Sequence, residues 1–142
     1  MLSIIGLLAS AGFGRLGVDT LANIRAEGDA QRMAMDLRYA RGLAMRSGSD
    51  AHAVRLTLTG SDFTASQVVR IANSGAGAVT SLDANRAVNG KVMTSPAHEA
   101  MTFRFDGSAN HAYHLRFTGP RRRWDVTVAR ATGRVAVVES TP

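Results

Sequence analysis

The fold is decided by residues 25–48, RAEGDAQRMAMDLRYARGLAMRSG. Small or apolar residues recur there every three or four positions, and that spacing places them on one stripe of an α-helix. The stripe consists of Ala26, Ala30, Met33, Leu37, Ala40 and Ala44. Gly48 follows at the position where a left-handed residue ends many helices. The spacing therefore predicts a helix whose stripe is a packing face for a sheet or for other helices.

The chain upstream of this stripe is more apolar. Residues 1–13 are apolar or small apart from two serines, and glycines recur at positions 6, 12, 14 and 17. Small residues let neighbouring helices approach closely in a membrane. Thirteen apolar residues are fewer than the roughly 20 that cross a bilayer. We expect one helix over residues 3–47, with residues 1–25 as its membrane-anchoring half and residues 26–142 as a globular head.

Downstream of residue 50 the apolar period changes from helical to alternating. Strands are expected near residues 54–58, 63–71, 101–105, 113–117, 124–128 and 135–137. Residues 72–100 are rich in small polar residues and are expected to be mostly loop, with one short strand at 91–94. Turn pairs separate the last four strands, which predicts an antiparallel meander with Trp124 in its core. The predicted class is α+β, with the helical stripe covering the sheet.

The net charge of +6 is concentrated near the C-terminus. Sixteen arginines and one lysine oppose eleven acids, and residues 101–142 carry +4 of the total. A basic cluster of this kind attracts phosphate groups, although it is more typical of a solvated surface. The candidate anion-binding residues are Arg121, Arg122, Arg123 and Arg134.

The sequence offers little for catalysis or metal binding. Cysteine is absent, so the chain has no disulfide and no thiolate ligand. His52 and His98 fall in expected loops, and His111 and His114 are expected on opposite faces of a strand. The loop oxygens of Asp83, Asn85 and Asn89 are too few to define a calcium site. We therefore predict no catalytic residue, no metal and no cofactor.

Three segments together resemble the group formed by the type II secretion minor pseudopilin H and the FimT-like type IV pilins. They are DLRYARGLAMRSG at 36–48, MTFRFDG at 101–107 and ATGRV at 131–135. The resemblance implies a long helix on an antiparallel sheet and a non-enzymatic minor subunit of a filament. Its expected partners are other pilins or pseudopilins and the bacterial inner membrane, which a single helix spans, with the head in the periplasm. No small-molecule substrate is implied.

The front of the chain differs from that group. Its members carry a leader ending in glycine and a glutamate five residues into the mature chain, and Met1 would fall immediately after that glutamate. We expect an internal methionine, or a removed front, to explain the difference.

FimT-like proteins also suggest an alternative function, DNA binding through a Gly-Arg-x-Arg motif. The matching stretch, GRVA at 133–136, lacks the second arginine, which the GPRRRW segment at 119–124 could replace. Arg121, Arg122, Arg123 and Arg134 would then contact DNA phosphates.

Overall fold

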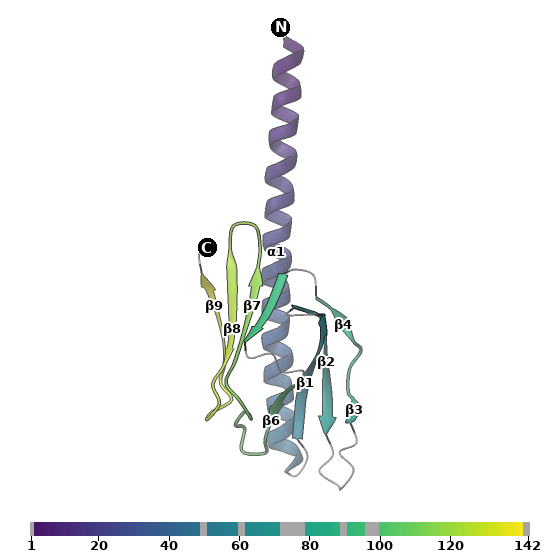
Figure 1. Cartoon of the computed structure of the whole chain (residues 1–142), viewed down its shortest axis with the longest axis vertical. Helices are drawn as coiled ribbons and strands as arrows, with labels where there is room; N and C mark the ends of the chain where they lie inside the picture. The colour runs from purple at the N-terminus through teal and green to yellow at the C-terminus, as the bar shows by residue number, and fades with distance from the viewer. Residues whose placement is uncertain are drawn as a thin grey trace.

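One long helix organises the molecule. In a computed structural model, the backbone is described for residues 2–48, 51–59, 62–71, 79–88, 91–95 and 100–140, and side chains for 17–48, 51–57, 64–71, 79–88 and 100–140. Helix α1 spans Leu2–Ser47 and ends at Gly48, which has a positive φ of 67°. The predicted helix and its glycine cap are confirmed. The N-terminal part of α1 extends well beyond the head (Figure 1).

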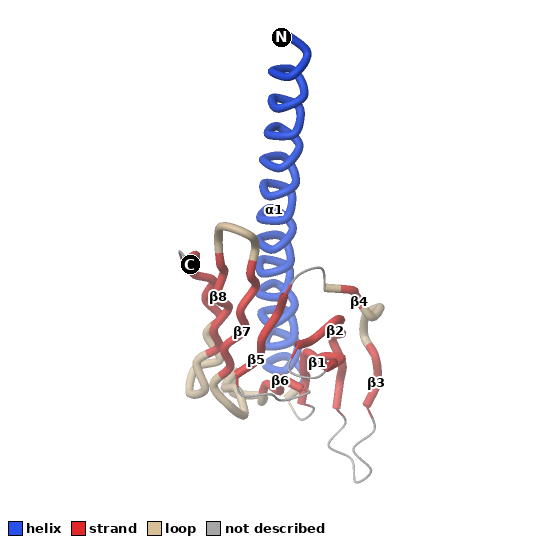
Figure 2. The backbone as a smooth tube through the Cα atoms, turned by 45° about the horizontal axis from the view of Figure 1, so that its top comes forward, coloured by secondary structure: helices blue, strands red, loops and turns tan. Residues whose placement is uncertain are grey.

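A single antiparallel sheet wraps around the C-terminal half of α1 (Figure 2). Its strands follow the order β6-β1-β2-β5-β7-β8-β9, and β3 and β4 each pair with β2. Their bounds are β1 Ala51–Thr59, β2 Asp62–Ile71, β3 Val79–Ser81, β4 Arg86–Ala87, β5 Lys91–Ser95, β6 Ala100–Phe103, β7 Tyr113–Thr118, β8 Arg123–Val128 and β9 Val135–Ser140. The predicted α+β class, a long helix on a mostly antiparallel sheet, is confirmed.

Three predictions about the sheet were wrong. Three of the last four strands pair in sequence order as predicted, β7 with β8 and β8 with β9, but β6 pairs with β1 and β7 pairs with β5, so the four strands do not form one meander. The connection from β6 to β7 is too long for a tight hairpin, so the sequence spacing did not determine the pairing. Residues 79–81 and 86–87, expected as loop, also add short strands to β2. Phe105, expected in a strand, lies beyond β6 and is exposed.

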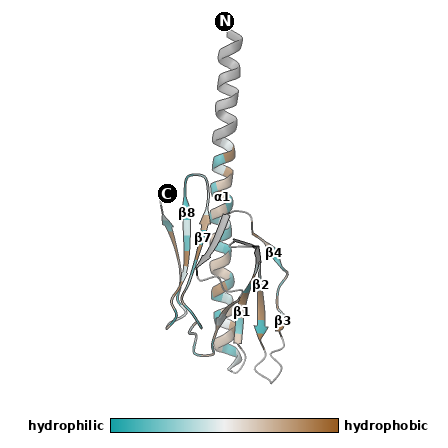
Figure 3. Cartoon of the chain, viewed as in Figure 1, coloured by the Kyte–Doolittle hydropathy of each residue, from teal (hydrophilic) through white to brown (hydrophobic). Residues whose placement is uncertain are grey.

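The core lies between α1 and the concave face of the sheet. All six residues of the predicted stripe are at most 2% exposed and pack in one cluster with sheet residues that include Phe103, Phe117 and Trp124. Burial alternates strictly along β7 and β8, and Figure 3 shows the corresponding change of hydropathy along β8. The expectations that the stripe covers the sheet and that Trp124 is a core residue are confirmed.

His52 corrects another expectation, because it lies in β1 and not in a loop. Only 4% of the residue is exposed, and its Nδ1 has no hydrogen-bond partner within the described part of the chain. It lies in register with Phe103 of β6. The predicted strand begins at residue 54, three residues after the observed start of β1 at Ala51, and therefore leaves His52 outside.

Some expectations fall outside the described residues. These are His98, Asn89 and the side chains of residues 1–16, which belong to the expected anchor half. Within the described part of the molecule, no helix is both long and apolar enough to cross a membrane.

The packing of α1 predicts a sharp difference between two neighbouring residues. Leu37 is completely buried, and Leu37→Ala should lower the free energy of unfolding by about 2–5 kcal/mol because it leaves a cavity. Met35 is exposed, and Met35→Ala should change it by less than about 0.5 kcal/mol. Urea unfolding of the full chain in non-ionic detergent measures both. Equal losses would contradict this orientation of the helix.

Candidate functional site

The face of α1 that points away from the sheet carries a second stripe. Met35 and Tyr39 are each two residues from Leu37, and at about 100° per residue this places them on the opposite side of the helix. Leu21, Ile24 and Gly28 extend the stripe toward the N-terminus. The four apolar side chains are 56–60% exposed. We call the five residues the outer stripe. It is left bare by the chain's own sheet, and sequence reasoning missed it because the buried stripe has the stronger pattern.

A groove borders the outer stripe. Its volume of about 730 Å³ is within the range of about 300–1,000 Å³ that is typical of ligand pockets. The groove lies between α1 and the segment that carries β3 and β4. Its polar part is an ion-pair group in which Arg86 pairs with Asp36 at 3.6 Å and with Asp83. Burial raises the pKa of Asp36, and the charge of Arg86 opposes that rise. The groove therefore joins an apolar helix face to a largely neutralised polar floor.

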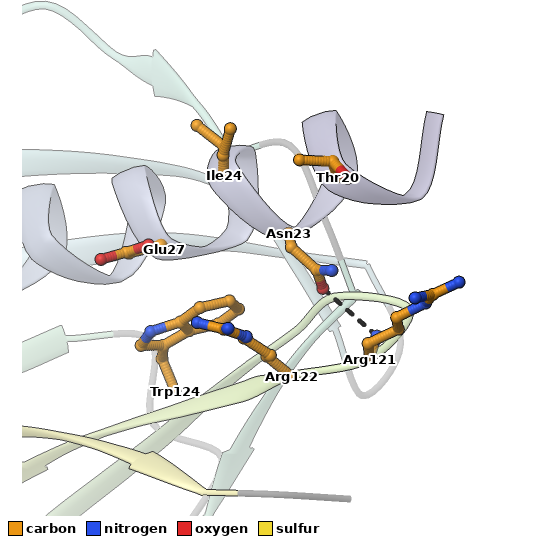
Figure 4. A pocket seen from close by; sticks show the side chains of 7 residues that line it. All are labelled: Thr20, Asn23, Ile24, Glu27, Arg121, Arg122 and Trp124. Carbon is orange, nitrogen blue, oxygen red and sulfur yellow. Dashed lines mark hydrogen bonds between the residues drawn. The ribbon is translucent and has the colours of Figure 1, made fainter. Parts of the chain in front are cut away.

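The arginine turn, residues 119–123, packs against the upstream part of the same helix. Figure 4 shows the backbone of Arg121 beside Asn23 of α1, with the side chain of Arg122 extending toward Trp124. Oδ1 of Asn23 accepts a hydrogen bond from the backbone N of Arg121 at 3.2 Å. Any side chain at position 119 would overlap that oxygen, so the close approach requires Gly119. The turn and the helix border a pocket of about 300 Å³, together with buried Trp124.

The arginines of this turn are not free cations. Arg121 pairs with Asp19 of α1 at 3.5 Å, and Arg122 pairs with Glu139 of β9 at 3.3 Å. Both pairs are exposed and are therefore worth little in stability. They nevertheless reduce the positive field that the sequence alone indicates. No ion pair involving Arg123 is found within the described residues.

Arg134 belongs to the loop between β8 and β9, at the end of the head away from the arginine turn (Figure 1). Its neighbour Gly133 packs against Arg41, whereas the arginine turn packs against Asn23. Eighteen residues of helix separate those two contacts, which corresponds to about 27 Å at 1.5 Å per residue. The structure therefore divides the four candidate arginines into two groups. Arg121, Arg122 and Arg123 stay together, and Arg134 instead lies close to Arg41, on a separate loop.

A polar cluster centred on Asp125 ties β7, β8 and β9 together. Its carboxylate accepts hydrogen bonds from Arg116 Nε at 2.8 Å, His114 Nε2 at 3.0 Å and Ser140 Oγ at 3.2 Å. Burial alone would raise the pKa of Asp125, but the bonds from Arg116 and His114 outweigh it and lower that pKa. Ser140 and His114 both bind the carboxylate, so the order of a Ser-His-Asp relay is not formed. The role of the cluster is therefore to hold the three strands together.

The Asp125 cluster predicts a pH-dependent contribution to stability. A lowered carboxyl pKa stabilises the fold above the unfolded value of about 3.9, and this stabilisation is lost as the pH falls through the folded value. Asp125→Asn should lower the free energy of unfolding by about 1 kcal/mol at pH 7. The difference in that free energy between the variant and the native chain should shrink below about pH 4. Urea unfolding across pH 2–7 measures it, with Glu139→Gln as an exposed control. A difference that stays constant down to pH 2 would contradict the assignment.

Metal and catalytic candidates gain no support from the geometry. Asp83 binds Arg86 and the backbone N of Ala84 through its carboxylate. Across the described ranges, no three or more His, Cys, Asp or Glu residues are grouped as metal ligands would be. His111 precedes β7, and His114 belongs to the Asp125 cluster.

A long helix half covered by an antiparallel sheet, with its other face bare, defines a pilin-like protein. The chain belongs to the GspH family: the sequence model described as "Type II transport protein GspH" matches residues 29–132. No curated protein sequence matches the chain significantly.

Two solved structures share this fold. Both are crystal structures of the type IV minor pilin FimU from Pseudomonas aeruginosa strain PAO1. The P65 form has a TM-score of 0.64 at 16% identity and covers 82% of this chain and 96% of its own. The P21 form has a TM-score of 0.66 at 14% identity and covers 84% and 94%. At these identities the similarity establishes the fold alone.

Proposed function

We propose that the chain is a minor subunit of a type II secretion pseudopilus or a type IV pilus, with a structural and non-enzymatic role in starting the filament or at its tip. The observation that carries the proposal is the outer stripe, which remains exposed on the face of α1 opposite the buried stripe. Family membership and the fold shared with FimU support the same function.

The outer stripe has the chemistry of a helix-packing surface. Exposed apolar side chains recur along it, and exposed apolar surface of this kind is typical of interaction sites. At Gly28 nothing lies within 4 Å of the position that a Cβ would occupy, so a partner helix can approach the backbone. The six residues of the buried stripe already contact the sheet, so the surface left for other subunits is the outer stripe.

In this proposal the two parts of the chain have separate tasks. Residues 1–25 anchor the subunit in the bacterial inner membrane as part of a single span, and residues 26–142 form a head in the periplasm. The partners are other pilins or pseudopilins in a mixed filament. Neither a cofactor nor a small-molecule substrate is required.

Charge placed on the outer stripe tests the proposal. Met35→Glu/Tyr39→Glu should reduce incorporation into filaments at least about tenfold, because two buried carboxylates would oppose helix packing. Recovery of the subunit in sheared filaments, or cross-linked to other pilins in the source bacterium, measures the effect. The melting temperature should stay nearly unchanged because both side chains are exposed.

Val138→Glu is the matched control, since Val138 is 56% exposed on β9. It introduces the same carboxylate on a different face and should assemble normally. Normal assembly of the double variant, or failure of the Val138 variant alone, would contradict the outer stripe as the packing surface.

DNA capture is the second candidate function. It is favoured by arginines that lack a carboxylate within 4 Å among the described residues, namely Arg123 at the turn and Arg134 at the opposite end. Phosphate contacts of this type bind without reading sequence and weaken as salt rises. The division of the arginines implies two separate contact regions.

An electrophoretic shift with double-stranded DNA at low salt tests this candidate. Arg121→Ala/Arg122→Ala/Arg123→Ala should weaken binding for all sequences equally and lower the salt dependence. Arg134→Ala tests the other region separately. Absence of any shift by the native chain at low salt would remove DNA capture while leaving the assembly role untouched.

A further inference from the structure

A small pocket lies at the end of the head opposite the arginine turn. It has a volume of about 140 Å³ and is lined by Arg104, Ser108, Ala109, Asn110, Arg130 and Ala131. Two loops form it, the connection between β6 and β7 and the turn between β8 and β9. The backbone N of Ala109 donates to the carbonyl of Arg130 at 2.9 Å and holds the loops together.

The frame around this pocket is fixed by close backbone packing. In the first loop, the carbonyl of Arg104 accepts a hydrogen bond from the backbone N of Gly107 at 2.9 Å. The backbone N of Arg104 donates to the carbonyl of Ser108, also at 2.9 Å. Arg41 of α1 donates to the carbonyl of Gly107 at 3.1 Å. A side chain at Gly133 would overlap that same carbonyl, so the second loop is pressed against the first. The pocket is therefore built by tertiary structure.

Asn110 presents an oriented donor at this pocket. Its Oδ1 accepts from the backbone N of Thr102 at 3.2 Å, from the N of His111 at 3.1 Å and from the hydroxyl of Tyr113. Three donors on one atom identify that atom as the amide oxygen. The Nδ2 group has no acceptor among the described residues, so its two hydrogens are available to a ligand.

The pocket is also positively charged. Arg104 and Arg130 are exposed and have no carboxylate within 4 Å in the described part of the chain. Asp106, the nearest acid in the sequence, does not line the pocket. Its carboxylate accepts from the N and the hydroxyl of Ser108 at 2.9 and 2.6 Å, and these bonds lower the pKa of Asp106. The pocket thus presents two guanidinium groups and one amide.

We propose that this pocket binds a phosphate group through Arg104, Arg130 and the Nδ2 group of Asn110. Guanidinium groups form paired, charge-assisted hydrogen bonds with phosphate oxygens. The pocket volume of about 140 Å³ is sufficient for a phosphate group. The site is distinct from the outer stripe and does not depend on the assembly role.

Calorimetric titration of the full chain in non-ionic detergent with inorganic phosphate tests the site. Native protein should bind one phosphate saturably. Arg104→Ala/Arg130→Ala should weaken binding at least about tenfold because it removes both charged donors. Asn110→Asp should do the same, since it keeps the oxygen that accepts three bonds and replaces the donor with a negative charge. Its melting temperature shows whether the fold is retained.

Arg55→Ala/Arg70→Ala is the matched control, because it removes two exposed arginines that do not line the pocket. It should leave phosphate affinity unchanged. Absence of saturable phosphate binding by the native chain, or an equal loss in this control, would overturn the proposal, since only a diffuse charge effect would then remain.

The same variants distinguish two sources of the phosphate. If it belongs to a nucleic acid backbone, Asn110→Asp should weaken binding of a short DNA duplex, and the salt slope should fall by about one for each lost contact. If duplex binding is unchanged while phosphate binding is lost, the ligand is a discrete phosphate. Either result supports the pocket and is independent of filament assembly.

Discussion

The structure depends on contact between a stripe of small residues on α1 and the concave face of the sheet. Four of the six stripe residues are alanines, all at most 2% exposed. Their size brings the helix backbone close to the sheet, and the large side chains Phe103 and Phe117 fill the space from the sheet side. The outer stripe follows from this contact, because a helix that buries one side in its own sheet leaves the opposite side exposed.

Close contacts of two glycines fix the sheet at both ends of the part of α1 that it covers. Gly119 lets the arginine turn reach Asn23, and Gly133 presses against the carbonyl of Gly107 beside Arg41. The ends differ in charge as a result. At the first, Asp19 on the helix meets Arg121, whereas the arginines at the second have no such partner among the described residues. The same contacts that lock the head thus leave one end paired and the other free to bind anions.

Prediction from sequence succeeded where periodicity was local and failed where pairing was not. The helix, its Gly48 cap and the turn at Gly133 follow from spacing and from the conformational freedom of glycine. The pairing of β6 with β1 could not be predicted, since alternation indicates a strand without naming its partner. The four candidate arginines looked contiguous because Arg121 and Arg134 are close in sequence, but β8 separates them in space.

The sequence by itself determined the fold class. The spacing of Ala26 through Ala44, followed by alternating strands, is sufficient for a long helix on an antiparallel sheet, because those periods report which face of each element is apolar. Only the tertiary structure decided which surfaces remain available. Whether Tyr39 is bare, Arg121 paired or Asn110 oriented depends on neighbours distant in the chain, and no local pattern records such contacts.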